Sequence, residues 1–207
     1  MRWLPPSARS ALQLRRLSQH VSPCPAAAAP RRSTSAASAP GRGGASGVAS
    51  AAAAAAQPVP CVCTVGDELL YGERESNGNE RYILRALHER GTPAVMASQL
   101  PDDPEIIAKF IRFAREQHLS PIFIAGGLGG THDDKTREAV ALALDLPLTR
   151  HAECFEILTE SFQRRDIEFT PQRQRMADLP DGCSLIENSV GAPGFAIDGI
   201  YAFPGFP

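Results

Sequence analysis

The sequence has no acidic side chain in its first 60 residues, although these carry seven of the 21 lysines and arginines of the 207-residue chain; the first carboxylate is Asp67. An N-terminus rich in arginine and serine and free of acid is typical of organelle transit peptides. It has no strongly apolar core after the first charges, which excludes a secretory signal. The alanine run at 51–56 is too short to span a membrane. We therefore expect residues 1–58 to be a disordered transit-peptide-like segment, mitochondrial in preference to plastid; without such an address the protein would be cytoplasmic.

The remaining chain lacks the basic surface of a nucleic-acid-binding protein. It carries 14 basic and 23 acidic side chains, a net charge of −9, which argues against a nucleic-acid partner. The five cysteines also lack a CxxC spacing. Cys61 and Cys63 flank one valine in a strand-like run, and this spacing suits neither zinc nor an intrastrand disulfide. We expect reduced, partly buried thiols, consistent with an intracellular compartment.

Apolar periodicity predicts one α/β domain over residues 59–207. Three strands are predicted, at 61–66, 94–100 and 121–125, of which the first reads as buried and the third has no polar face. Amphipathic helices should follow them, with Asn79 as N-cap of the first and Asp103 as N-cap of the second. Beyond a fourth helix and a short one starting at Pro171, the pair Asp198 and Gly199 suits a tight hairpin. This order predicts a three-layer αβα fold with a mostly parallel sheet.

A polar cluster follows each of these three strands: "GDELLYGERESNGN", "LPDD" and "GGLGGTHDD". In a doubly wound sheet, ligands bind beyond the carboxyl ends of the strands. The topology therefore brings Asp67, Glu68 and Asp102 to the same edge as the glycine-rich turn.

The glycine run at 126–130 is interpreted as a phosphate cradle, because bare amides at a strand end can approach an anion closely. It matches neither the P-loop pattern, since no lysine follows at the required spacing, nor G-x-G-x-x-G. The alternative is a flexible turn in which Asp133, Asp134 or Thr136 caps the next helix.

Mg²⁺ is the expected cofactor, since it takes one or two carboxylates together with substrate phosphates. Asp133 and Asp134 are the candidate metal ligands. His132 could donate to a phosphate oxygen, or it could be incidental to the site. No Ser-His-Asp or Cys-His arrangement can be argued from the sequence.

Six motifs occur in the order found in MoaB/Mog-type molybdopterin-binding domains: "TVGDELLYG", "LPDD", "GGLGGTHDDKTREAVA", "TPQRQRMADLP", "NSVGAPGF" and "FPGFP". The chain most resembles the CinA-type subgroup, which also forms the N-terminal half of some eukaryotic FAD synthases. The resemblance covers about residues 62–207. It implies a three-layer αβα fold, a homo-oligomer (dimer or trimer), and a phosphorylated pterin or nucleotide as the small-molecule partner, with no membrane partner.

The resemblance also implies roles for individual residues. The catalytic aspartates of the adenylyl-transfer branch fall on Asp102 and Asp134. The candidate ligand-binding residues are Asp67, Glu68, Asn79, Gly126, Gly127, Gly129, Thr131, His132, Thr136, Gly191 and Gly194.

The chain departs from the family pattern at three places. Gly130 replaces a proline, Asn79 matches the family asparagine only if one residue is inserted, and the "NSVGAPG" loop is shortened. No segment matches the second domains of CinA or FAD synthase, so their activities are not expected here. Three functions remain open: a Mg²⁺-dependent hydrolase of ADP-ribose or a related nucleotide pyrophosphate, a molybdopterin adenylyltransferase, and a non-catalytic ligand-binding module.

Overall fold

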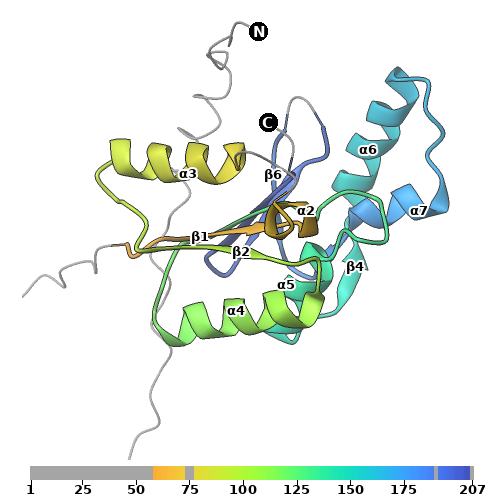
Figure 1. The fold of residues 1–207 in the computed structure, drawn as a ribbon. Coiled ribbons are helices and arrows are strands. Elements are labelled where there is room, and N and C mark those ends of the chain that lie inside the picture. The colour runs from red at the N-terminus through yellow and green to blue at the C-terminus, as the bar shows by residue number, and fades with distance from the viewer. Residues whose placement is uncertain (1–57, 73–76, 189–190, 206–207) are drawn as a thin grey trace, which may run out of the picture. The chain divides into compact units, whose positions relative to one another are not determined.

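The computed structural model describes residues 58–72, 77–188 and 191–205 (Figure 1). The predicted transit segment lies outside these residues, apart from Pro58. Within the described ranges, no helix combines the length and apolarity needed to cross a membrane.

A six-stranded sheet has the strand order β2-β1-β3-β8-β7-β6. Four strands are parallel, namely β2 (Met96–Leu100), β1 (Cys61–Val65), β3 (Ile122–Ala125) and β8 (Ile200–Phe203). The sheet continues antiparallel through β7 (Gly194–Ile197) and β6 (Ser184–Ile186). The predicted mostly parallel sheet is confirmed, and the three predicted strands are adjacent at its parallel end, with β2 as the half-buried edge strand.

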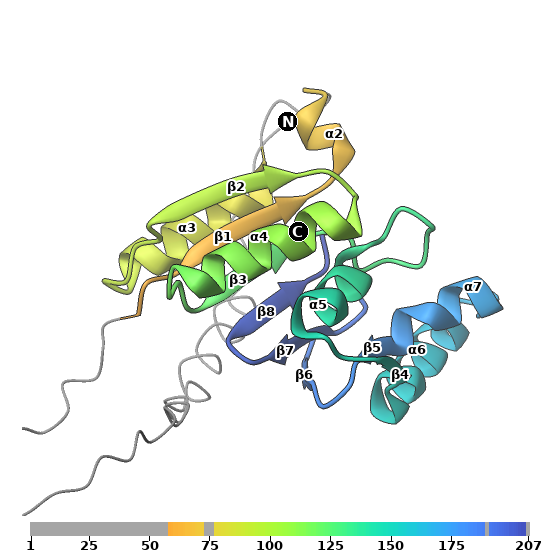
Figure 2. The ribbon, with the colours of Figure 1, turned by 90° about the horizontal axis from the view of Figure 1, so that it is seen from below.

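Helices cover both faces of the sheet, which gives the three layers that the pattern predicts (Figures 1 and 2). Helix α3 (Gly78–Glu89) lies on one face, while α4 (Pro104–Glu116) and α5 (Thr136–Leu144) lie together on the other. Every residue of β1 is buried, as expected for a strand covered on both sides. The largest fully buried side chains include Ile107, Ile111, Ile124, Val140 and Phe195.

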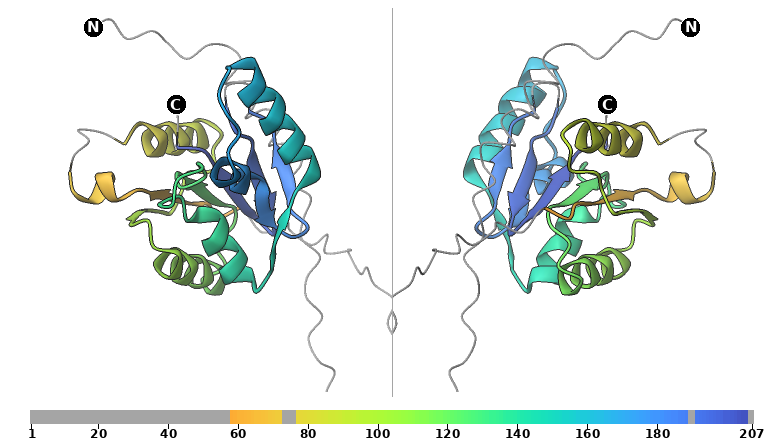
Figure 3. Two further views of the ribbon diagram at one scale, coloured as in Figure 1. Left: turned by 90° about the vertical axis from the view of Figure 1, so that its right-hand side faces the viewer. Right: turned by 90° about the vertical axis from the view of Figure 1, so that its left-hand side faces the viewer.

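A smaller subassembly lies on the β6 side of the sheet (Figure 3). A two-stranded antiparallel sheet, β4 (Leu148–Arg150) and β5 (Asp178–Pro180), packs on α5. It is joined by α6 (Ala152–Arg164), α7 (Pro171–Gln174) and the 3₁₀ turn η1 (Arg175–Ala177). The short helix α2 (Asp67–Leu70) follows β1. The sequence does not predict α2, β4 or β5, because three or four residues are too few to show a period.

Most helix ends and turns agree with the predicted turn chemistry, with one correction. The Asp103 carboxylate caps α4 by accepting from the N–H groups of Glu105 and Ile106. Asp198 and Gly199 have φ values of 45° and 78° and join β7 to β8 as predicted. Asn79 does not cap α3: the cap is Asn77, whose side chain accepts from the Glu80 N–H.

Candidate functional site

An open cleft of about 660 Å³ lies at the carboxyl edge of the parallel strands. The three polar clusters meet there, together with the first turn of α3 and the chain after β8. The lining residues with polar side chains or bare backbone include Thr64, Gly66, Asp67, Glu68, Asn77, Gly78, Asn79, Asp102, Gly126, Gly127, Gly129, Thr131, Asp133, Asp134 and Gly205. The predicted convergence of the three clusters is therefore present in the structure.

The glycine loop, residues 126–130, begins where β3 ends. Gly126 has φ 110°, and a Cβ at this position would lie 2.2 Å from the Val65 carbonyl oxygen, so only glycine fits. The Gly126 N–H donates to the Phe203 carbonyl at 3.0 Å. The buried Thr136 hydroxyl donates to the Gly126 carbonyl at 2.7 Å. The start of the loop is thus fixed by β1, β8 and α5.

Asp134 fixes the far side of the glycine loop. Its Oδ1 accepts from the Gly129 N–H at 2.6 Å, and its Oδ2 accepts from the Thr131 N–H at 2.8 Å and from the Thr131 hydroxyl. The N-cap position of α5 is Lys135, and no side-chain cap bond is made there. The alternative in which Asp133, Asp134 or Thr136 caps α5 is therefore wrong, because the Asp134 carboxylate is turned back onto the loop.

A buried arginine on α5 holds the same loop through a backbone carbonyl. The Arg137 side chain is on α5, the residue is 5% exposed, and its Nη1 donates to the Gly129 carbonyl at 2.9 Å. Burial lowers the pKa of this guanidinium, and the charge of Asp134 opposes that shift. The sequence gives no signal for this residue, since an arginine in an amphipathic helix is ordinarily expected at the surface.

Two of the loop amides that line the cleft are without a protein acceptor. Among the described residues, no hydrogen-bond acceptor is found for the backbone N–H of Gly127 or of Leu128, and both residues line the cleft. Partnerless N–H groups at a strand end are the groups that bind phosphate oxygens in glycine-rich loops.

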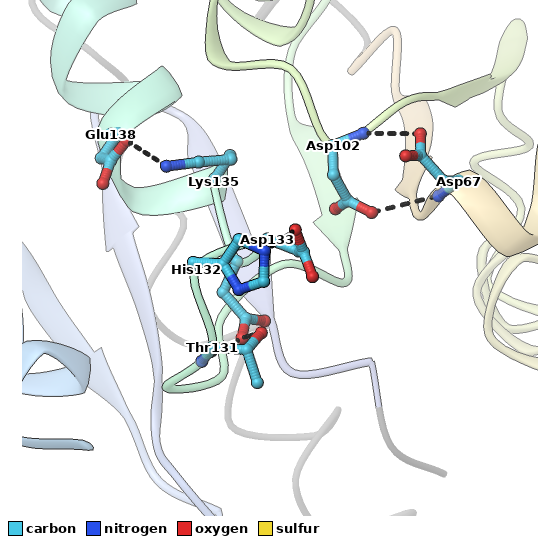
Figure 4. A network of polar contacts seen from close by, with 8 residues as sticks. Asp67, Asp102, Thr131, His132, Asp133, Lys135 and Glu138 are labelled. Carbon is cyan, nitrogen blue, oxygen red and sulfur yellow. Dashed lines mark hydrogen bonds and ion pairs between the residues drawn. The ribbon is translucent and has the colours of Figure 1, made fainter. Parts of the chain in front are cut away.

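Asp67 and Asp102 form a reciprocal pair across the ends of β1 and β2 (Figure 4). The Asp67 N–H donates to Asp102 Oδ2 at 3.1 Å, and the Asp102 N–H donates to Asp67 Oδ1 at 3.3 Å. Burial raises the pKa of Asp102, the hydrogen bond from Asp67 lowers it, and the charges of Asp67, Glu68 and Asp134 raise it further. The pair faces the loop that carries Thr131 and Asp133.

A polar network closes the cleft on the α3 side. The Asn77 amide donates to the Thr64 hydroxyl at 2.7 Å and to Glu80 Oε2 at 3.2 Å, and the Gln99 amide donates to the same Glu80 oxygen at 3.2 Å. Sequence reasoning did not single out Thr64 or Asn77 as lining residues, although Asn77 lies within the first predicted cluster and Thr64 lies just before it.

Four of the predicted ligand-binding residues do not line the cleft. His132 is exposed and pairs with Asp133 at 3.0 Å. Thr136 is fully buried and holds Gly126, so its hydroxyl supports the loop instead of facing the cleft. Gly191 and Gly194 belong to the β6–β7 side of the sheet, where a Cβ on Gly194 would meet the Ala202 carbonyl at 2.5 Å. A direct ligand contact from these four is not supported.

The remaining predicted site residues all line the cleft: Asp67, Glu68, Asn79, Asp102, Gly126, Gly127, Gly129, Thr131, Asp133 and Asp134. Five of them are carboxylates, while no lysine or arginine is found in the described part of the lining.

The donor set fits a Mg²⁺ ion that is bound together with a phosphorylated ligand. Within the described residues, no three His, Cys, Asp or Glu side chains lie close enough to hold a metal by themselves. Mg²⁺ needs only one or two carboxylates where phosphates and water complete its octahedron. Asp133 and the remaining lone pair of Asp134 Oδ1 could supply these, so Mg²⁺ stays a prediction.

Comparison with known proteins identifies the family of this chain. Residues 61–207 match the family model described as a probable molybdopterin binding domain. A protein of Metallosphaera sedula is 36% identical over 151 residues, covering 70% of this chain and 57% of its own length. A protein of Pyrococcus furiosus is 37% identical over 158 residues, with coverages of 70% and 62%. The chain thus spans less than two thirds of either relative.

A solved structure agrees with these matches. The crystal structure of the protein CinA, of unknown function, from Thermoplasma acidophilum is 33% identical, has a TM-score of 0.65, and covers 72% of this chain and 88% of its own. The chain therefore belongs to the molybdopterin-binding domain family, of MoaB/Mog type, and is CinA-like within it.

Proposed function

We propose that the cleft binds a phosphorylated pterin or nucleotide and, with Mg²⁺, hydrolyses a nucleotide pyrophosphate such as ADP-ribose. The observation that carries this proposal is the pairing of two acceptor-free loop amides, Gly127 and Leu128, with five cleft carboxylates and no cleft cation among the described residues. Amides favour phosphate oxygens, whereas carboxylates repel them unless a cation lies between. A Mg²⁺-pyrophosphate satisfies both.

The protein's own residues would divide the work as follows. Gly127 and Leu128 bind the phosphate oxygens, and Asp134 and Arg137 keep the loop in place for them. Asp102, a stronger base because its pKa is raised, accepts a proton from the attacking water. Water adds to one phosphorus, the bond to the bridging oxygen breaks, and ADP-ribose gives AMP and ribose 5-phosphate. When bound, Mg²⁺ supplies charge neutralisation at the phosphates.

A non-catalytic binding module is the second candidate. It is favoured by one observation: the Asp134 carboxylate already accepts from three donors of the loop, so a metal would have a single lone pair of Oδ1 to bind. Such a module would bind the ligand with the same loop amides and release it unchanged. Molybdopterin adenylyl transfer is the remaining alternative that the family suggests.

A panel of ligands distinguishes these functions. The full chain would be incubated with ADP-ribose, FAD, NAD, or molybdopterin plus ATP, each with Mg²⁺ and with EDTA, and products would be separated by chromatography. We expect AMP and ribose 5-phosphate from ADP-ribose with Mg²⁺ only. Adenylylated molybdopterin would support the transferase instead. No product from any mixture, with tight binding of one ligand by calorimetry, would rule out the hydrolase.

Two further proposals concern the whole protein. Residues 1–58 direct it to mitochondria, which a reporter fused to residues 1–60 tests; a cytosolic reporter would contradict this. The domain forms a homo-oligomer, dimer or trimer, which light scattering at micromolar concentration tests; a monomeric mass would contradict it.

A further inference from the structure

The last residue of β8 and the two residues after it, residues 203–205, lie against the glycine loop. The Phe203 carbonyl accepts the Gly126 N–H at 3.0 Å. Two residues later the backbones meet again, because a Cβ on Gly205 would lie 3.2 Å from Gly126 Cα. Gly205 also lines the cleft. This segment, which we call the 203–205 wall, is therefore packed on the first residue of the loop and contributes Gly205 to the lining of the cleft.

A hydrogen bond from Asn79 holds this segment to helix α3. Its Nδ2 donates to the Gly205 carbonyl at 2.8 Å, joining residues 126 positions apart in the sequence. Asn79 lies in the first turn of α3, next to Asn77, whose side chain is held by Thr64 and Glu80. The wall is thus anchored to a part of α3 that is fixed by its own network.

We propose that Asn79 is a positioning residue: through Gly205 it holds the 203–205 wall against Gly126 and so keeps the adjoining Gly127 and Leu128 amides directed into the cleft. Its side chain serves the loop and not the ligand. The inference rests on the proposed function only for the location of the ligand at these amides.

The same contact limits the size of the side chain that position 205 can carry. A contact of 3.2 Å between a new Cβ and backbone is tighter than a Cβ normally tolerates, and the atom it meets belongs to the loop backbone. The Gly205→Ala variant should therefore displace the glycine loop, although none of the loop residues is itself substituted. By contrast, a Cβ on Gly78, which lines the cleft in the same turn of α3 as Asn79, meets nothing within 4 Å.

Amide hydrogen exchange of Gly126 in the ligand-free full chain tests the proposal, since this N–H donates to Phe203. Asn79→Ala removes one hydrogen bond, and we expect Gly126 exchange to rise about fivefold and the Kd for ADP-ribose with Mg²⁺ to weaken by about the same factor. Gly205→Ala should also raise Gly126 exchange and the Kd. The double variant should change both quantities little beyond the single variants, because both substitutions act through one contact. Gly78→Ala is the matched control and should leave Gly126 exchange unchanged.

Two results would overturn the inference. Unchanged Gly126 exchange in a folded Asn79→Ala variant would remove the link between Asn79 and the loop, and weaker ADP-ribose binding in the same variant would then indicate direct contact with the ligand. Additive effects in the double variant would show independent roles. If the unaltered protein does not bind ADP-ribose, the proposed ligand is wrong, whereas the exchange measurement still decides the role of Asn79.

Discussion

Asp134→Ala is the substitution whose consequence the structure defines most sharply. The Asp134 carboxylate accepts two N–H groups and one hydroxyl, all from the glycine loop. Hydrogen bonds to a buried charge contribute about 1.5–3 kcal/mol each, and this side chain is only partly buried. Allowing for solvent screening, we expect the three together to contribute about 2–3 kcal/mol. In a domain of this size that lowers Tm by about 5–10 °C.

Thermal unfolding followed by circular dichroism would measure this loss. Asp133→Ala is the matched control, since the neighbouring carboxylate is 66% exposed and pairs with His132, whose side chain is also exposed. Its effect should stay within about 0.5 kcal/mol. Asp134→Asn keeps one acceptor oxygen, so its Tm should lie between those of Asp134→Ala and Asp133→Ala. Equal Tm values for Asp134→Ala and Asp133→Ala would refute the assignment of Asp134 as the loop's anchor. Loss of Mg²⁺-dependent turnover at unchanged Tm would assign Asp134 to the metal alone.

Three other predictions follow from side-chain environments. Gly130→Pro should lower stability by about 1 kcal/mol in urea unfolding, because the added atoms crowd Arg173 Cα and Met176, each 3.2 Å from a Cβ at this position; a stabilised variant would contradict this. Because the pKa of Asp102 is raised in the folded state, the folded protein holds the Asp102 proton more tightly than the unfolded protein does. The free energy of unfolding therefore falls as the pH rises through the pKa of Asp102 in the folded state. Asp102→Asn should therefore be more stable than the unaltered protein at pH 7, by less than about 1 kcal/mol, and lose this advantage below pH of about 4; a larger advantage in acid would contradict it. Burial raises the pKa of the Cys61 thiol to about 11, so Cys61 should resist Ellman's reagent at pH 8 until guanidinium is added, and rapid labelling of Cys61 itself in the native protein, located by peptide mapping, would be inconsistent with this.

The sequence predicts the frame of this site well because strand ends and helix starts are marked by local residues. An apolar strand followed by glycine or aspartate identifies the cleft edge, as at Gly66 and Asp102. The direction in which a side chain turns is a different matter. Asp134 could have capped α5 or held the loop, and only the folded path of residues 129–131 decides between them.

The missed residues share a physical reason. Arg137 is buried because α5 brings its side chain under Gly129, and a helical position alone does not specify what covers it. Asn77 and Asn79 are two residues apart, so local sequence could not tell which one caps α3 and which one reaches Gly205. Both cases depend on partners distant in the chain, which periodicity does not specify.

The position of β8 has a consequence for the order of folding. It is the last strand along the described chain, yet it lies in the middle of the sheet between β3 and β7. Strands β1, β2 and β3 can pair as soon as they are synthesised, but the β3 edge stays open until residues 200–203 arrive. Long-range parallel pairing of this kind is slow and leaves an edge exposed to other chains. The Gly126 N–H also gains its partner, the Phe203 carbonyl, only when β8 has paired with β3, so we expect the start of the glycine loop to be fixed no earlier than that pairing.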